Sequence, residues 1–307
     1  MNRTEPWRLS RRALLLGFAA TASSGARAQA GKLPVIASFS ILADFVRRIG
    51  GERVEVTTLV APGNDVHVYE PTPDDARKLA RARLIVINGL GLEGWLERLM
   101  KASATMAPTI VASVGVKPIK ESDVGQSRAR DARNDPHAWQ SIANVKIYVA
   151  NIRDGLVNAD SGGAAIYRAN SDAFLAELDT LEKEIRAAVD SIPRERRRII
   201  TTHDAFGYFG ATYGFSFIAP KGVSTETEPS AADVAKIIRQ IKAEKVPAVF
   251  LENVSDPRLM QRIAAESGAK VGGTLFSDSL SPPGGPATTY FDMVRNNLKE
   301  LTAALAR

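Results

Sequence analysis

Short apolar runs alternate with amphipathic segments along most of the sequence, and this alternation limits the fold more than any other feature. In the first half, four runs rich in β-branched residues read as buried strands, at 33–39, 54–60, 83–89 and 109–115. Segments with helical spacing lie between them, such as SILADFVRRIG and LEGWLERLMKA. Strands that alternate with helices predict a parallel sheet covered by helices.

The same alternation begins again in the second half of the sequence. Four further apolar runs lie at 197–203, 215–220, 247–253 and 270–276, with SAADVAKIIRQIKAEK and DPRLMQRIAAESG as helical segments between them. We therefore predict an α/β protein with two parallel-sheet lobes.

A long amphipathic segment lies between the two halves. Its apolar residues follow the i, i+4, i+7 spacing of one helix face and are Phe174, Leu178, Leu181, Ile185, Ala188 and Ile192. A helix from Ala164 to Ile192, ended by Pro193, would be about 40 Å long at about 1.5 Å per residue. We expect a rigid connecting helix, with a surface helix of one lobe as the alternative. The expected divisions are 31–160 for the first lobe, 161–193 for the connection and 194–307 for the second lobe.

The first thirty residues have the pattern of an export signal. Arg8, Arg11 and Arg12 precede the short apolar core ALLLGFAATA, and ARAQA offers small-residue cleavage sites. The core is too short for a stable membrane anchor. SRRALLL also resembles a twin-arginine signal, with ordinary export as the alternative, and by either route residues 1–30 predict a periplasmic protein whose signal is removed.

Charge and cysteine content exclude several classes of protein. The chain has a formal net charge of +6, and loss of residues 1–30, with five arginines and one glutamate, lowers it to +2. The remaining sequence has no basic patch with interleaved aromatic residues, so we expect no nucleic-acid partner. The absence of cysteine excludes disulfides and thiolate metal sites. It also predicts a free periplasmic protein and not a lipoprotein.

Histidine is rare in this sequence and occurs at informative places. His67 lies in GNDVHVYEP, His137 in NDPHAWQ and His203 in TTHDAFGYFG, each in a loop or at the carboxyl end of an expected strand. Asp278, in TLFSDSL, follows the last expected strand. Open α/β sheets bind ligands at this edge. Any one of these residues would ordinarily be a structural histidine or a turn aspartate, but the four together indicate a site in a cleft between the lobes.

Three imidazoles and one carboxylate are the donor types of a tetrahedral zinc site. Manganese prefers more oxygen ligands, and calcium or magnesium would need carboxylates and carbonyls almost exclusively. The residues therefore favour Zn²⁺ as the bound ion, with Mn²⁺ as the alternative.

Several blocks of the sequence resemble the zinc- and manganese-specific solute-binding proteins of ABC transporters. They are APGNDVHVYEPTPDDARKLARARLIVINGLGLEGWLERL, NDPHAWQS, TTHDAFGYFGATYG, STETEPSAADV, VFLENVSDPRLMQRIAAESG and GGTLFSDSL. The resemblance implies two α/β lobes bridged by one rigid helix, with metal ligands at His67, His137, His203 and Asp278. Manganese-selective members resemble this pattern but have glutamate at the position of His203, which favours zinc. Many zinc-specific members also have a histidine-rich loop before the second ligand, and the segment 120–136 of this chain has no histidine.

Further residues are candidates for supporting the ligands. Asp204 could orient an imidazole, and three glutamates in the shared blocks could hold loops by hydrogen bonds; these are Glu70, Glu228 and Glu252. Trp139 would belong to an apolar wall around the metal. Ordinary solvated acids and plain core packing are the competing interpretations.

The expected function is capture of Zn²⁺ in the periplasm and delivery to an ABC permease in the inner membrane, by a monomer, with a periplasmic metallochaperone as a further possible partner. A zinc-dependent hydrolytic enzyme is the main alternative. We expect no enzyme, because H-E-x-x-H is absent and Asp278 would fill the position of a catalytic water. A second alternative is an adhesin or metal chaperone that uses the same fold to bind a protein partner. We expect release to involve movement of Asp278 and the segment 277–286, SDSLSPPGGP, and affinity to fall below about pH 6.5.

Overall fold

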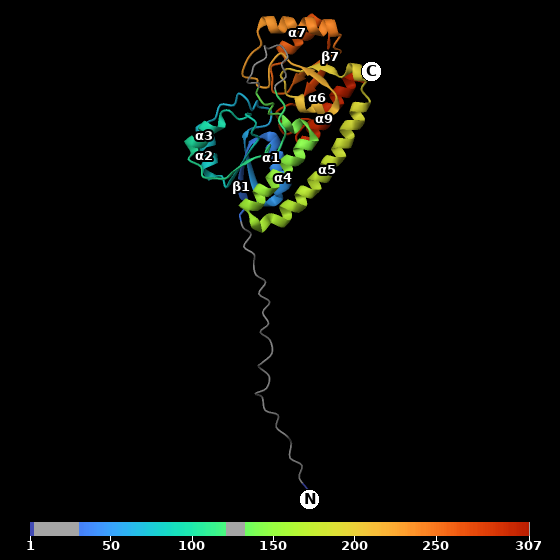
Figure 1. Cartoon of the computed structure of the whole chain (residues 1–307). Coiled ribbons are helices and arrows are strands. Elements are labelled where there is room, and N and C mark those ends of the chain that lie inside the picture. Colours follow the sequence, from blue (N-terminus) through green and yellow to red (C-terminus); the bar gives the residue numbers. More distant parts are fainter. Residues whose placement is uncertain (3–30, 121–132, 307) are drawn as a thin grey trace. The chain divides into compact units, whose positions relative to one another are not determined.

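The first sheet carries four parallel strands in the order β2-β1-β3-β4 in the computed structural model, which describes residues 1–2, 31–120 and 133–306 (Figure 1). The expected export signal and most of the segment 120–136 therefore lie outside the described residues. The strands are β1 (Leu33–Phe39), β2 (Val54–Val60), β3 (Leu84–Ile87) and β4 (Thr109–Val111). The helices of this lobe are α1 (Ser40–Gly50), α2 (Pro73–Arg81), α3 (Leu96–Ser103) and α4 (Ile142–Ala159).

The second sheet repeats the strand order of the first. Its strands are β5 (Arg198–Ile200), β6 (Ser216–Ile218), β7 (Ala248–Glu252) and β8 (Lys270–Leu275), parallel and in the order β6-β5-β7-β8. Its helices are α6 (Gly207–Tyr213), α7 (Ala231–Glu244), α8 (Arg258–Ser267) and α9 (Tyr290–Leu305). In both sheets the second strand in sequence lies at one edge and the fourth at the other, so the fold is the expected pair of parallel-sheet α/β lobes.

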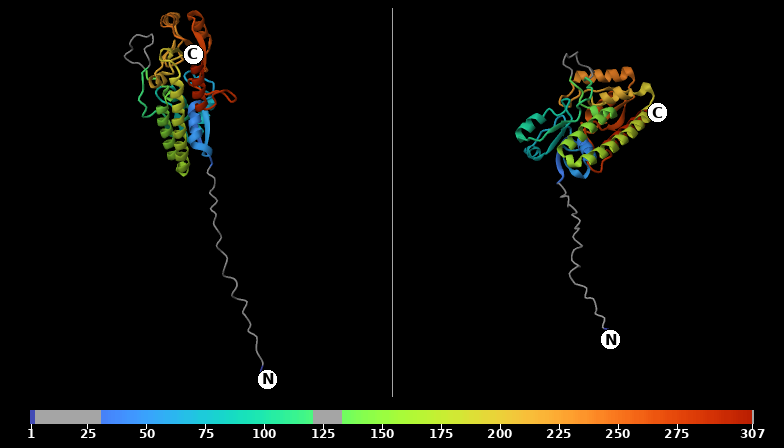
Figure 2. Two further views of the ribbon diagram at one scale, coloured as in Figure 1. Left: turned by 90° about the vertical axis from the view of Figure 1, so that its right-hand side faces the viewer. Right: turned by 60° about the horizontal axis from the view of Figure 1, so that its bottom comes forward.

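The long helix α5 (Ala164–Asp190) connects the lobes. It has 27 residues and packs against α1 and α4 of the first lobe and against α9 of the second (Figures 1 and 2). Its buried side chains follow the expected spacing and are Tyr167, Ser171, Phe174, Leu178, Leu181, Ile185 and Val189. The helix ends two residues before the expected Ile192, and Val189 takes the buried place expected for Ala188. The connecting helix is confirmed.

The two lobes share a hydrophobic core. One cluster of buried side chains includes Phe39 and Phe45 of the first lobe, Phe174 of α5, and Phe250 and Leu275 of the second lobe. A smaller cluster fills the space between the second sheet and helices α7 and α8. Residues Lys32–Arg307 accordingly form one compact unit. Within the described residues, no helix is long and apolar enough to span a membrane.

N-capping residues in the sequence explain where helices α2 and α7 begin. Thr72 caps α2 by accepting a hydrogen bond from the backbone N–H of Asp75, whose side chain accepts from the Thr72 backbone, and Pro73 occupies the first helical position. Ser230 and Asp233 form the same reciprocal cap at the start of α7. The two caps fix the ends of the loops that precede α2 and α7, and both loops reach the site described next.

Candidate metal centre

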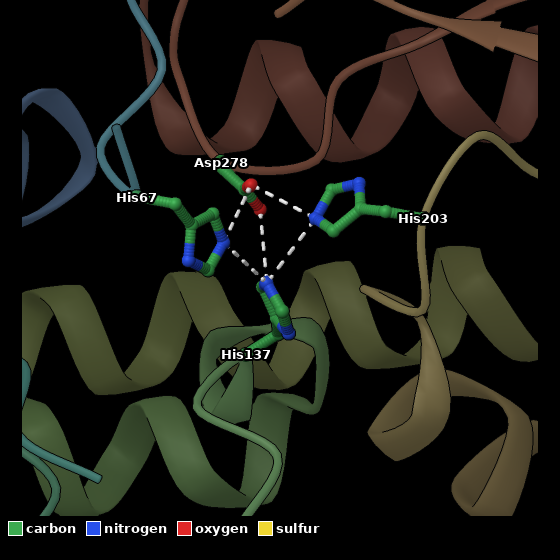
Figure 3. Close-up of side chains that lie close together, drawn as sticks. All are labelled: His67, His137, His203 and Asp278. Carbon is green, nitrogen blue, oxygen red and sulfur yellow. Dashed lines mark hydrogen bonds and ion pairs between the residues drawn. The ribbon is translucent and has the colours of Figure 1, made fainter. Parts of the chain in front are cut away.

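The structure brings together all four residues singled out as ligands. His67 lies in the loop after β2 and His137 immediately before the short 3-10 helix Ala138–Gln140, while His203 and Asp278 each lie three residues beyond a strand, β5 and β8. One donor atom from each side chain lies within 4.8 Å of all the others. Figure 3 shows the three rings and the carboxylate pointing toward one centre.

The spacing of the donor atoms fits a tetrahedral ion. The Nε2 atom of His137 lies 3.2 Å from that of His67 and 3.3 Å from that of His203. The oxygens of Asp278 lie 3.3, 3.4 and 3.0 Å from the Nε2 atoms of His67, His137 and His203. Zinc bonds of about 2.0–2.1 Å would place the corners of a tetrahedron about 3.3–3.4 Å apart. The five distances are close to these values, so the cluster suits a small tetrahedral cation.

Carboxylates outside the cluster orient two of the imidazoles. The Nδ1 atom of His137 lies 2.7 Å from Oδ1 of Asp135, and the Nδ1 atom of His203 lies 2.5 Å from Oε2 of Glu252. An ionised carboxylate only accepts hydrogen bonds, so each Nδ1 donates. In the neutral rings this leaves the Nε2 lone pairs directed at the centre, as a metal requires.

The same carboxylates also hold the backbone at these histidines. Asp135 accepts from the N–H of His137, and Glu252 accepts from the N–H groups of Thr202 and His203. Both acids are buried, with exposed fractions of 1% and 3%. The backbone and the ring of each histidine are thus held by one buried carboxylate, which restricts the movement of these two candidate ligands.

The electrostatics of the cluster favour a cation. Asp278 is fully buried, and neither of its oxygens accepts a hydrogen bond from the described residues. Burial alone would raise the pKa of Asp278, but the positive charge available on His203 and His137 holds it well below its ordinary value. Burial alone would lower the pKa of His203, but the facing carboxylates of Glu252 and Asp278 raise it well above 6.5. A buried anion beside inward lone pairs needs a proton or a metal ion.

Contacts with the first lobe hold the loop that carries Asp278. The carbonyl of Ser277 accepts from Nε1 of Trp139 and Nε2 of Gln140. The backbone N–H of Gly63 donates to the hydroxyl of Ser279 at 2.8 Å and that of Leu280 to the hydroxyl of Ser40 at 3.0 Å. Residues 277–281 are buried. These contacts hold the segment in this structure, and the expected movement of Asp278 and residues 277–286 on metal release stays a prediction.

The other candidate residues differ in whether they contact the site. Glu252 and Trp139 contact the site as described, and the ring of Trp139 packs edge-on to His137 at 5.3 Å. Asp204 is buried, and its backbone N–H donates to the carbonyl of Gly222. Glu70 is exposed, and Glu228 is exposed and pairs with Lys221. The structure does not bring the last two into the cluster.

Asp135 is a functional candidate that our sequence analysis missed. Both Asn64–His67 and Asn134–His137 read N-D-x-H, and in each the aspartate accepts from the backbone N–H of the histidine, at 2.8 Å. The repeated four-residue pattern was the available signal, because aspartate often accepts a hydrogen bond from the N–H two residues later.

Comparisons with known proteins agree with this architecture. Residues 35–304 match the family model described as zinc-uptake complex component A, periplasmic. The manganese-binding lipoprotein MntA of Halalkalibacterium halodurans is 35% identical over 90% of this chain and 89% of its own length. The iron-binding protein YfeA of Yersinia pestis is 32% identical over 91% and 88%. The periplasmic zinc-binding protein TroA of Treponema pallidum superposes with a TM-score of 0.83 at 30% identity, covering 90% of this chain and all of that one.

These relatives correct one expectation. MntA and several others of similar identity are named lipoproteins, which contradicts the prediction that this protein is not a lipoprotein. That prediction was wrong, because it was drawn from the absence of cysteine alone and the names of its relatives point the other way.

Proposed function

This chain belongs to the zinc-uptake complex component A family, and on that premise we propose that it captures Zn²⁺ through His67, His137, His203 and Asp278 and delivers it to an ABC permease. The family consists of substrate-binding components of metal ABC transporters and not of enzymes. The observation that carries the proposal is the buried convergence of three Nε2 atoms on a carboxylate that accepts no hydrogen bond from the described residues.

The donor set supports zinc over manganese. Three nitrogen donors and one carboxylate at tetrahedral spacing suit Zn²⁺, whereas Mn²⁺ is best served by more oxygen ligands. Relatives at similar identity are named for manganese, iron and zinc, so manganese is the second candidate. A permease with its ATPase is the partner of the family. A monomeric state and a metallochaperone partner are further parts of the proposal.

The arrangement gives little support to hydrolytic chemistry. A catalytic zinc keeps one coordination position for water, whereas in the proposed site Asp278, whose oxygens lie 3.0–3.4 Å from the three Nε2 atoms, would take that fourth position. All four side chains are buried, and His67, the most accessible of them, has an exposed fraction of only 7%. Capture and release of the ion is the function that the geometry favours.

Metal stoichiometry and competition test the proposal. We expect the stripped protein to bind one equivalent of Zn²⁺ and to prefer it to Mn²⁺ by at least about 100-fold. Nitrogen-rich sites bind Zn²⁺ much more tightly than Mn²⁺. Elemental analysis and competition with a chromogenic chelator provide the measurement. Equal or greater affinity for Mn²⁺ would overturn the zinc assignment while leaving metal capture in place.

The pH dependence of binding follows from His203 and Asp278. Because the pKa of His203 lies well above 6.5 in the metal-free protein, its proton stabilises that state at low pH, and this stabilisation is lost as the pH rises through the raised pKa. Asp278, whose pKa is depressed, contributes stability above about 3.8 and loses it only in stronger acid. Zinc must displace the His203 proton. We therefore expect zinc to raise the Tm more at about pH 8.5 than at about pH 6, measured by scanning calorimetry. An increment that is the same at both pH values would contradict this.

A further inference from the structure

His67 differs from the other three candidate ligands in its surroundings. It has an exposed fraction of 7%, whereas His137, His203 and Asp278 have 0%. Its ring borders a cavity of about 180 Å³ that Leu90, Asn134 and Ser224 also line. Among the described residues, no carboxylate accepts from its Nδ1, in contrast to His137 and His203. His67 is therefore the least enclosed and least constrained ligand.

The backbone at His67 is held from both lobes. On the first-lobe side, Nε1 of Trp95 donates to the carbonyl of Val66 at 2.8 Å. On the other side, Oγ1 of Thr225 donates to Oδ2 of Asp65 at 2.6 Å, while Oδ1 of Asp65 accepts from the N–H of His67 at 2.8 Å. A hydroxyl that donates to a carboxylate at this distance makes a strong, charge-assisted hydrogen bond. Thr225 thus connects the second lobe to His67 through one side chain.

Thr225 belongs to residues 219–230, which connect β6 to α7 and which we term the closing segment. Val223, Ser224 and Glu226 of this segment line the cavity at His67. Thr225 and Glu226 also line a second cavity, of about 630 Å³, on whose wall Asp65 lies. Thr225 itself is buried, with an exposed fraction of 8%. The closing segment therefore lies beside the most accessible ligand, and the Thr225–Asp65 hydrogen bond joins the two.

We propose that Thr225 is a positioning residue for metal exchange: through Asp65 it holds His67 at the metal, and the ion enters and leaves on the His67 side when this hydrogen bond opens. The inference rests on the proposed function, because it assumes that the four-residue cluster binds the ion. Loss of the hydroxyl raises the population in which the His67 loop is open and so accelerates dissociation. A charge-assisted hydrogen bond of this kind corresponds to about tenfold in rate.

The test is the rate of zinc dissociation from the full-length protein into excess chelator, followed by stopped flow. Thr225→Val and Thr225→Ala each remove the hydroxyl and should dissociate about tenfold faster. Thr225→Ser keeps the hydroxyl and should restore a rate close to that of the unmodified protein. Thr227→Val is the matched control, because Thr227 is exposed on the same segment, and it should leave the rate unchanged.

A double-mutant cycle distinguishes an effect of Thr225 that acts through Asp65 from a general destabilisation of the loops around the site. In an Asp65→Ala background, Thr225→Val should change the rate by less than about twofold. If the unmodified protein binds no zinc, the proposed function fails. If it binds zinc and both hydroxyl-deleting variants dissociate within about twofold of it, or if Thr225→Ser is as fast as Thr225→Val, the inference alone is overturned.

Discussion

Replacing His203 by alanine should lower the affinity for Zn²⁺ by about 100- to 1,000-fold. Four-ligand zinc sites bind with about 10–16 kcal/mol, so one ligand in four corresponds to about 2.5–4 kcal/mol. His203 is fully buried and lies 3.0 Å from Asp278, so no solvent ligand replaces it without repacking. Competition titration with chelators of graded affinity measures the change. An affinity within about fivefold of the unmodified protein would show that the ligand set is wrong.

The companion variant His203→Glu separates loss of a ligand from a change of ligand type. A carboxylate would convert the donor set to two nitrogens and two carboxylates, which moves its preference toward manganese. We expect weaker Zn²⁺ binding together with a smaller ratio of zinc to manganese affinity. Glu252 loses its imidazole partner in both variants. Circular dichroism of the metal-free variants is therefore the control for correct folding.

Replacing Glu252 by alanine should destabilise the metal-free protein by about 3–5 kcal/mol, which is the usual cost of removing one partner from a buried, hydrogen-bonded charge pair. Its carboxylate accepts from the backbone N–H groups of Thr202 and His203 and from Nδ1 of His203. The variant leaves these donors unpaired in the interior, and zinc affinity should fall by about 10- to 100-fold because the imidazole loses its orientation. Chemical denaturation and chelator competition measure the two effects separately.

Glu228→Ala is the matched control for Glu252→Ala. Both glutamates lie in blocks that the sequence singled out, but the side chain of Glu228 is 77% exposed and pairs with Lys221 at the surface. Its replacement should change the free energy of unfolding by no more than about 0.5 kcal/mol. Equal effects of the two substitutions would mean that burial of Glu252 does not determine its role.

Much of the fold could be predicted because apolar periodicity reports burial directly. The runs 33–39 and 54–60 correspond to β1 and β2, where helices cover the sheet and nearly every residue of β1 is buried. The predicted strand length was less accurate where the chain turns soon after a short strand. The run 109–115 suggested seven strand residues, but β4 ends at Val111, because the N–H of Val114 donates back to the carbonyl of Val111 and Gly115 takes a positive φ of 89°.

The candidate ligands could also be predicted, because histidine is scarce and each candidate follows a strand or lies in a loop. The supporting residues could not be sorted by sequence, since Glu70, Glu228 and Glu252 are the same residue type in similarly distinctive blocks. Only burial separates Glu252 from the other two. The Thr225–Asp65 hydrogen bond joins residues 160 positions apart, so it depends on how the lobes meet, which no local pattern encodes.

The core shared by the two lobes determines how the molecule responds to its cargo. Unfolding either lobe alone would expose the apolar side chains that the other lobe and α5 bury against it, so partial opening is costly and the chain is expected to melt as one cooperative unit. We expect bound metal to slow amide hydrogen exchange even in strands far from the site, because an ion that binds only the folded state stabilises the whole unit. Bound metal should therefore be detectable by hydrogen exchange in both lobes, with no probe placed at the site itself.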